Sequence, residues 1–408
     1  MSDNAFDILT ERGFIAQVTD EAAVREMLAQ PIVCYVGFDG TADSLHVGNL
    51  VTIMSLMHLQ RAGHKPIGLV GGGTTMIGDP SGKTELRQML DEAAIQANGR
   101  RLHQQLNHYL NFDGGQAIAE NNANWLLKLN YVTFLREIGR HFSVNRMLAA
   151  EAYKQRLERG LSFIEFNYQI LQAYDYLELY RRYKCVLQMG GDDQWGNILA
   201  GVDLVRRIEG VTVQAMTYNL LTTASGAKMG KTAAGAVWLS AEKFSPYDYY
   251  QYWINCDDRD VGKLLRIFTF LPIEEIRRLE ALEGAVLREA KRILAHEATV
   301  ITHGEAEAIA AAEAARAAFG GGGEMEAMPT TNIDANRLAA GISVLEIFAE
   351  VGLAKSRSEA RRMVEQGGVY VNDNRVDNHE AQLTSADVTP HGIMLRAGKK
   401  KYHRLVIS

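Results

Sequence analysis

The sequence predicts an α/β protein built on a parallel sheet, because short apolar strands alternate with helical stretches over roughly the first 220 residues. Residues 31–39 (PIVCYVGFD) form an apolar run, and 46–63 follow with a helical pattern. Residues 65–72 (KPIGLVGG) supply the next strand and close a right-handed β-α-β unit. A further strand in 184–197 (KCVLQMGGDDQWGN) enters a glycine-acid turn before a helix that runs to about residue 207.

Composition narrows the class of protein. The 408 residues suffice for two or three domains, and 47% hydrophobic with 23% charged residues is ordinary for a soluble globular chain. The opening stretch mixes acids among its apolar residues, so we expect neither a signal peptide nor a membrane anchor. Three scattered cysteines without a C-x-x-C pair favour free thiols in the cytoplasm over disulfides or zinc.

Four segments are expected along the chain. We expect a Rossmann-like catalytic domain with a connective insertion over 1–220, and a loop followed by a helical domain over 221–319. The glycine-rich GGGGEMEAMPTT opens a linker at 320–340, and a small α+β domain occupies 341–408. This last segment holds ten Lys/Arg against eight Asp/Glu, a weak sign of an anionic partner, although charge alone favours an ordinary solvated surface.

Acids stand at the ends of the predicted strands, where parallel sheets bind their ligands. They are Asp39, Asp79 and Asp193. Asp79 lies in GDPSGKT (78–84), which is one residue short of the phosphate-binding G-x-x-x-x-G-K-[ST] loop. Pro80 offers no N–H and the aspartate would repel phosphate, so a phosphate cradle is disfavoured here.

Two short motifs become specific only as a pair. His46 in HVGN begins a helix after the first strand, where free N–H groups favour phosphate. KMGKT (228–232) carries two lysines, which alone would suggest only a solvated loop. Their order, about 180 residues apart, resembles the HIGH and KMSKS signatures of class I aminoacyl-tRNA synthetases. YVGFDGTADSLHVGN, GLVGGGTTMIGDPSGK, FNYQILQAYD, GGDDQWGN and GAKMGKT together resemble the bacterial tyrosyl-tRNA synthetase family.

The resemblance implies a binding site for tyrosine. Tyr35 and Asp175 match positions that read the phenolic hydroxyl, and an unpaired buried donor and acceptor would penalise phenylalanine. Asp79, Tyr168 and Gln172 match the receptor of the α-ammonium group. Tyr168, Gln172 and Asp175 stand at i, i+4 and i+7, on one helix face. Gln194 would lie near the substrate carboxylate, while Asn122 and Trp125 match further substrate-side positions.

The implied reaction is tyrosine activation by ATP, followed by transfer to the 3′ end of tRNA(Tyr). The ATP-binding residues would be Asp39, Gly48, Gly191, Asp193 and Lys231. Stabilisation of the leaving pyrophosphate would fall to Thr41, His46, Asn49, Lys228, Lys231 and Thr232. The expected cofactors are ATP as substrate and Mg²⁺, without zinc or an organic group. Asn49 replaces the last histidine of HIGH, and an amide still donates a hydrogen bond.

The last segment resembles the small S-four-like RNA-binding domain. Six basic residues are the expected phosphate contacts: Arg357, Arg361, Arg362, Lys399, Lys400 and Lys401. A docking domain with an ordinary basic surface is the alternative. The expected partners are tRNA(Tyr), tyrosine, ATP and a second copy of the chain, with no membrane. Two rivals stay open: a synthetase of the same class that charges tryptophan, and a non-catalytic RNA-binding regulator on a synthetase scaffold.

Overall fold

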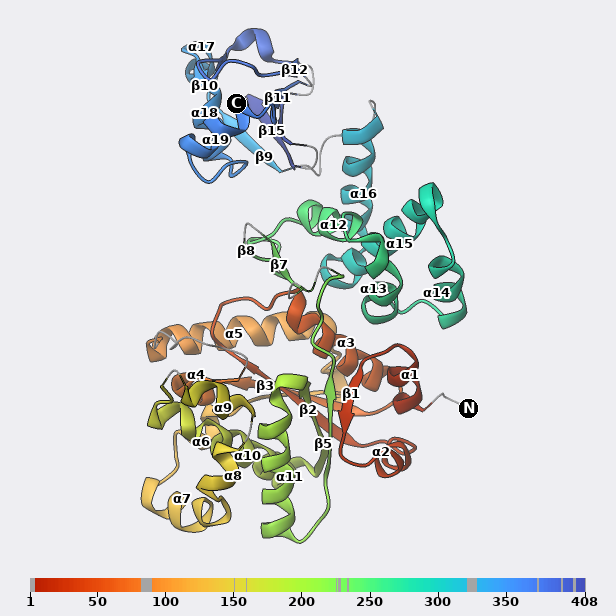
Figure 1. The fold of residues 1–408 in the computed structure, drawn as a ribbon, viewed down its shortest axis with the longest axis vertical. Helices are drawn as coiled ribbons and strands as arrows, with labels where there is room; N and C mark the ends of the chain where they lie inside the picture. The colour runs from red at the N-terminus through yellow and green to blue at the C-terminus, as the bar shows by residue number, and fades with distance from the viewer. Residues whose placement is uncertain are drawn as a thin grey trace. The chain divides into compact units, whose positions relative to one another are not determined.

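The computed structural model divides into two compact units, each described by itself (Figure 1). The first comprises Met1–Lys243 and Asp257–Ala281, and the second comprises Phe244–Cys256 and Leu282–Ser408. The structure describes residues 4–81, 90–149, 151–158, 160–224, 226, 229–232, 235–320, 329–372, 374–389, 392–398 and 401–407. These units do not coincide with the four segments expected from the sequence, whose boundaries stay a prediction.

A six-stranded sheet forms the centre of the first unit. Its strands, in spatial order, are β1 (Ile15–Val18), β6 (Gln214–Tyr218), β5 (Cys185–Gly191), β2 (Val33–Asp39), β3 (Lys65–Gly71) and β4 (Ile118–Asn121). All neighbouring pairs are parallel except β1 with β6. The chain order reverses direction between β2 and β5, so the carboxyl ends of these two strands form the switch point where ligands bind in such sheets.

Helices of the first unit flank this sheet. They are α1 (Ala5–Glu11), α2 (Glu21–Met27), α3 (Val47–Arg61), α4 (Thr74–Ile77), α5 (Glu92–Tyr109), α6 (Ala123–Leu126), α7 (Tyr131–Glu137), α8 (Val144–Leu148), α9 (Glu151–Leu157), α10 (Phe163–Tyr183), α11 (Trp195–Glu209), α13 (Val261–Phe268) and α14 (Ile273–Glu280). Figure 1 shows α10 and α11 side by side, and they pack on β5. Ser162 and Glu165 form the capping box that starts α10.

Burial explains why the predicted strands form the centre. β3 is buried at six successive positions, and Tyr35 of β2 pairs in register with Ile67 of β3 and Gln188 of β5. A strand covered by helices on both faces reads as a near-continuous apolar run, which is the pattern that the sequence gives at 65–72. The α/β fold class predicted from this pattern is therefore confirmed.

Segment 257–281 belongs to the first unit, although the sequence suggested one helical domain over 221–319. Arg12 follows α1 and is almost fully buried. Its guanidinium donates to the carbonyl oxygens of Arg266 (2.9 Å), Thr269 (2.8 Å) and Leu271 (2.5 Å), at the end of α13. These bonds satisfy carbonyls that a helix end leaves unpaired, and so fix α13 against α1.

The second unit contains a helical part and a small α+β part. Its elements are α12 (Pro246–Ile254), α15 (Leu287–His303), α16 (Glu305–Gly320), β9 (Thr330–Ile333), α17 (Ala335–Ala339), β10 (Ile342–Ser343), α18 (Val344–Glu350), α19 (Arg357–Glu365), β11 (Val369–Val371), β12 (Asn374–Arg375), β13 (Gln382–Leu383), β14 (Ile393–Ala397) and β15 (Lys401–Ile407). The five-stranded order is β12-β11-β14-β15-β9, with only β15 and β9 parallel. Residues 356–376 contain α19, β11 and β12.

Candidate active site

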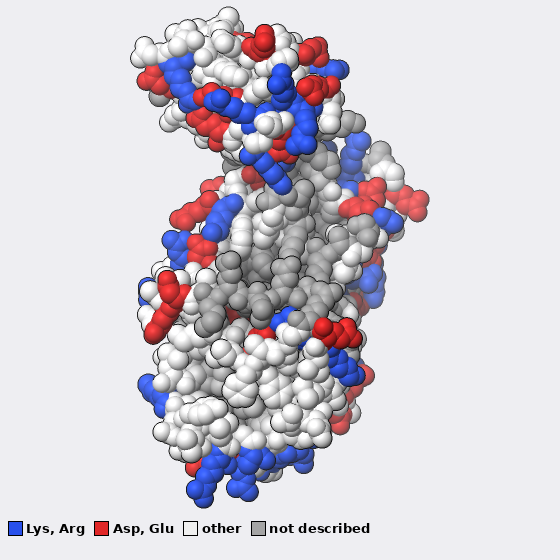
Figure 2. All heavy atoms as spheres, turned by 60° about the vertical axis from the view of Figure 1, so that its left-hand side comes forward, with Lys and Arg blue, Asp and Glu red and all other residues white. Residues whose placement is uncertain are grey.

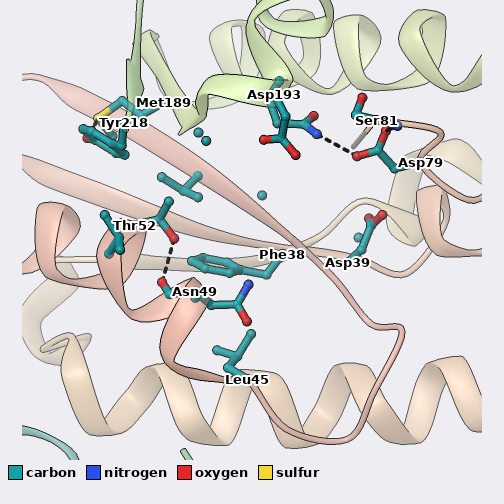
Figure 3. Close-up of a pocket in the computed structure, with 18 of the residues that line it drawn as sticks. Phe38, Asp39, Leu45, Asn49, Thr52, Asp79, Ser81, Met189, Asp193 and Tyr218 are labelled. Carbon is teal, nitrogen blue, oxygen red and sulfur yellow. Dashed lines mark hydrogen bonds between the residues drawn. The ribbon is translucent and has the colours of Figure 1, made fainter. Parts of the chain in front are cut away.

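A cavity of about 540 Å³ opens at the carboxyl ends of β2 and β5 (Figure 3). Its wall includes six expected tyrosine-side residues, Tyr35, Asp79, Tyr168, Gln172, Asp175 and Gln194, and also Asn122, but not Trp125. It also includes the expected ATP-side and catalytic residues Asp39, Thr41, His46, Gly48, Asn49, Gly191 and Asp193. The structure thus brings together residues that are separated by up to about 160 positions in the sequence.

One end of the cavity carries a buried tyrosine beside a buried carboxylate. Tyr35 is 1% exposed, and its hydroxyl has no hydrogen-bond partner within the described part of the chain. Burial, with the nearby carboxylate of Asp175 second, raises the pKa of Tyr35 well above its ordinary value. Asp175 is 2% exposed, and burial raises its pKa to about 8 despite its hydrogen bonds. A polar ligand group arriving here would meet a hydroxyl and a carboxyl group in a dry environment.

Asp175 is held by two donors from the loop and helix after β4. Asn122 Nδ2 donates to Asp175 Oδ2 at 2.9 Å, and Trp125 Nε1 donates to Oδ1 at 2.7 Å. Asn122 is itself fixed, because its Oδ1 accepts the Gly73 N–H at 2.7 Å. The two further substrate-side matches, Asn122 and Trp125, therefore hold and orient the Asp175 carboxylate.

Two further carboxylates line the middle of the cavity, each engaged by neighbours. Gln194 Nε2 donates to Asp79 Oδ2 at 2.7 Å, and Figure 3 shows a dashed contact that ends at Asp79. The Tyr168 hydroxyl donates to Asp39 Oδ2 at 3.1 Å. Asp39 was expected to bind ATP, yet it is hydrogen-bonded to Tyr168, which was expected to bind tyrosine. Gln172 Oε1 is buried without a partner among the described residues, and can accept from a ligand cation.

The HVGN motif is a helix N-terminus with reciprocal caps. His46 Nδ1 accepts the Gly48 N–H at 3.0 Å, and Asn49 Oδ1 accepts the His46 N–H at 3.1 Å, which together make a capping box for α3. A side chain at Gly48 would collide with the imidazole, since a Cβ there would lie 2.7 Å from His46 Cε1. His46 both caps α3 and lines the cavity.

The expected loop residues are only partly described. Lys228 lies outside the described residues, and so do the side chains of Lys231 and Thr232, whose backbone forms β7 (Lys231–Thr232) opposite β8 (Gly235–Ala236). Gly230 is described: its backbone has φ +83°, and a Cβ there would lie 2.9 Å from Gly48 N. The described backbone of the second motif therefore touches the first.

Two wall residues were missed from the sequence. Gln188 stands within β5, is buried, and has no partner for its Oε1 within the described ranges. It read as one polar residue in an apolar strand, and that anomaly was the available signal. Trp238 follows the loop and lines the cavity near His46. No spacing rule connects it to HVGN, so the sequence held no signal for it.

Two models of known protein families match this chain. A model described as tRNA synthetases class I (W and Y) matches residues 27–320, and one described as tyrosine–tRNA ligase SYY-like C-terminal domain matches 323–405. A tyrosine–tRNA ligase of Syntrophus aciditrophicus is 55% identical over 98% of both chains, and one of Caldanaerobacter subterraneus is 52% identical over 99% of both. This chain belongs to the tyrosine–tRNA ligase family. A C-terminally truncated mitochondrial tyrosyl-tRNA synthetase of Aspergillus nidulans is 30% identical with a TM-score of 0.70, covering 77% of this chain and 94% of that one.

Membership of the tyrosine–tRNA ligase family confirms the resemblance drawn from the five sequence segments, and with it the use of ATP as a substrate. Within the ranges that the structure describes, no three His, Cys, Asp or Glu side chains gather as a metal site would require. Over the same ranges, no helix is long and apolar enough to cross a bilayer. Cys34, Cys185 and Cys256 are free thiols.

The six basic residues expected to contact RNA lie within the segment that matches the C-terminal domain model, where acidic residues accompany them. Arg357 pairs with Glu346, and Arg361 lies 3.9 Å from Glu365. Figure 2 likewise shows acidic side chains among the basic ones on this domain. Arg362 and Lys401 are exposed, whereas Lys399 and Lys400 lie outside the described residues. A uniformly basic face is therefore not what the described residues present.

Proposed function

We propose that this chain is a tyrosine–tRNA ligase that forms tyrosyl-adenylate from tyrosine and ATP and then esterifies the 3′ end of tRNA(Tyr). The observation that carries the proposal is that the buried, unpartnered Tyr35 hydroxyl and the buried Asp175 carboxyl line the same cavity. A phenol both donates and accepts a hydrogen bond, so it can serve both groups. Phenylalanine would leave both without a partner from the ligand.

Activation needs no nucleophile from the protein. The tyrosine carboxylate attacks the α-phosphorus of ATP, an oxygen–phosphorus bond forms, and the bond to the leaving pyrophosphate breaks. A ribose hydroxyl of the tRNA then attacks the activated carbonyl, loses its proton and displaces AMP. The protein contributes alignment and charge stabilisation. We assign the ammonium group to Asp79, Tyr168 and Gln172, because their oxygens line the middle of the cavity.

We assign charge stabilisation on pyrophosphate to the two motifs. Thr41, His46 and Asn49 would act from the start of α3, whose N-terminus favours anions. Lys228, Lys231 and Thr232 would act from the loop. Gly48, Gly191, Asp39 and Asp193 would contact the nucleoside. Mg²⁺ would enter with ATP, held chiefly by its phosphates. Neither zinc nor an organic cofactor is part of the proposal.

Tyrosine-dependent exchange is the decisive test. The purified protein is incubated with ATP, labelled pyrophosphate and each of the twenty amino acids singly. We expect label to enter ATP with tyrosine alone. Exchange that depends on tryptophan would indicate a synthetase of the same class that charges tryptophan. No exchange with any amino acid would indicate a non-catalytic RNA-binding regulator.

The C-terminal domain would dock tRNA through Arg357, Arg361, Arg362, Lys399, Lys400 and Lys401. Deleting residues 341–408 should leave pyrophosphate exchange within about twofold of the full chain, and slow transfer to tRNA at least about tenfold, because phosphate contacts supply most of non-specific affinity. An equal loss in both steps would contradict a separate RNA-docking role.

We further propose that the protein is a homodimer of the cytoplasm, as befits tRNA charging in bacteria. Large apolar side chains are exposed between residues 127 and 164, among them Val132 (72% exposed) and Phe163 (70%). Apolar clusters of this kind mark protein interfaces. Val132→Glu combined with Phe163→Glu should yield a monomer in sedimentation velocity. Val286→Glu, an exposed apolar residue elsewhere, is the matched control and should leave the dimer intact.

A further inference from the structure

Trp238 lies in a segment, residues 237–239, that is hydrogen-bonded to the HVGN segment through an isolated β-bridge. Val47 N donates to Val237 O at 2.9 Å, and Leu239 N donates to Leu45 O at 2.9 Å, so His46 and Trp238 form an antiparallel bridge pair. Val237 and Leu239 are buried, whereas Trp238 lines the cavity. This alternation is what a strand imposes on successive side chains, and it directs the indole to the same side as the imidazole.

The indole and the imidazole are in contact. Their ring centroids are 6.2 Å apart, with an interplanar angle of 58°. The Gly48 N–H already fixes His46 from one direction, through Nδ1. Trp238 supplies a second constraint on the ring, from a different segment of the chain. A catalytic imidazole that is held from two directions keeps its orientation without a reorganisation cost at the moment of reaction.

Trp238 is in turn held by a charged cluster. The Lys243 ammonium lies 5.3 Å from the centroid of the indole, a cation–π distance. Asp43 Oδ1 accepts from Lys243 at 2.7 Å, and Asp43 Oδ2 lies 3.2 Å from Arg101. These ion pairs fix the lysine over the indole, so the tryptophan is constrained by both its backbone and its ring.

The segment 237–239 also contacts the described part of KMGKT. Val237 N donates to Gly230 O at 2.9 Å, and Gly230 lies against Gly48 N. Gly230 and residues 237–239 therefore touch the start of α3. Among the residues that line the cavity, Trp238 is the one whose ring pairs with His46 and whose backbone continues from the second motif.

From this geometry we propose that Trp238 is a positioning residue for adenylate formation, acting through His46. It orients the imidazole toward the phosphate end of the cavity and takes no part in recognising tyrosine. The inference rests on the proposed function, since it deepens the role given there to His46. A positioning role of this kind predicts a loss in turnover, because small displacements of an aligned group slow a reaction by up to about a hundredfold.

The test compares two substitutions that differ in the ring. Trp238→Leu keeps apolar bulk without an aromatic face, and should lower kcat for tyrosine-dependent pyrophosphate exchange by about tenfold or more. Its KM for tyrosine should stay within about twofold, because no tyrosine contact is lost. Trp238→Phe keeps a ring for the imidazole and should recover kcat to within about threefold of the unmodified chain.

A double-mutant cycle asks whether the effect passes through His46. His46→Ala with Trp238→Leu should be no slower than His46→Ala alone, within about twofold, since a ring that is absent cannot be misoriented. Additive losses, a raised KM for tyrosine, or equal losses for Trp238→Leu and Trp238→Phe would overturn the inference. So would full activity in His46→Ala. Absence of tyrosine-dependent exchange in the unmodified chain would instead overturn the proposed function itself.

Discussion

Replacing Tyr35 with phenylalanine should stabilise the protein and weaken its specificity at once. The Tyr35 ring is buried, lies 5.4 Å from the ring of Tyr176, and loses only its hydroxyl in the variant. That hydroxyl has no partner among the described residues. An unpaired buried hydroxyl costs about 1–3 kcal/mol, so its removal should raise the stability of the unliganded enzyme. About 1 kcal/mol corresponds to a rise of roughly 2–4 °C in Tm for a unit of this size.

When tyrosine is bound, the effect of Tyr35→Phe is unfavourable, whereas in the unliganded enzyme it is favourable. With tyrosine present, the Tyr35 hydroxyl would hydrogen-bond the substrate phenol, a contact of about 0.5–1.5 kcal/mol. Tyr35→Phe should therefore raise the KM for tyrosine about two- to twelvefold, and reduce the preference over phenylalanine by the same factor. The assays are thermal unfolding of the free protein and pyrophosphate exchange with tyrosine and with phenylalanine. A lowered Tm together with an unchanged KM would show that the hydroxyl serves the fold and not the ligand.

Three further outcomes follow from the same structure. Burial raises the pKa of Asp175 to about 8, so its contribution to the free energy of unfolding is fully present below about pH 4 and is lost as pH rises through 8. The free energy of unfolding in urea should therefore be lower at pH 8 than at pH 5, and this difference should be smaller for Asp175→Asn than for the unmodified chain. Arg12→Met leaves three carbonyls without their donor and should lower Tm by several degrees, while Arg259→Met, at an exposed site, should not. Gly230→Ala, at φ +83° and 2.9 Å from Gly48 N, should slow pyrophosphate exchange without raising the KM for tyrosine; unchanged turnover would refute the tight approach of the two motifs.

The strand ends were predictable because a parallel sheet has few ways to arrange them. Apolar runs ending in Asp39 and Asp193 had to place these acids at one edge, since the carboxyl ends of parallel strands share an edge. Asp79 follows the neighbouring strand and reaches the same cavity. The helix that carries Tyr168 and Asp175 was equally constrained, because a separation of seven residues returns to the same helix face.

Residues that act through a neighbour could not be predicted in this way. Trp238 reaches His46 across a single isolated β-bridge, and no periodic sequence pattern predicts so short a pairing. The donors to Asp175 were visible as residues, but their action on the back of the carboxylate depends on where β4 ends beside α10. Segment 257–281 joined the first unit through the buried Arg12, a contact that spans more than 250 positions and that no local signal announces.

The unpaired atoms of the cavity wall identify its occupant more sharply than the fold does. Three of them lie on the described wall of the cavity: the Tyr35 hydroxyl, Gln172 Oε1 and Gln188 Oε1. The two amide oxygens accept only, and an α-ammonium group has three donors to offer. The hydroxyl can donate, so it is fully used only by a ligand that accepts at that end. A phenol accepts there and also donates to the neighbouring Asp175 carboxyl, an indole N–H can only donate, and a phenyl ring does neither. The pattern of missing partners therefore selects tyrosine over tryptophan and phenylalanine on hydrogen-bond chemistry alone.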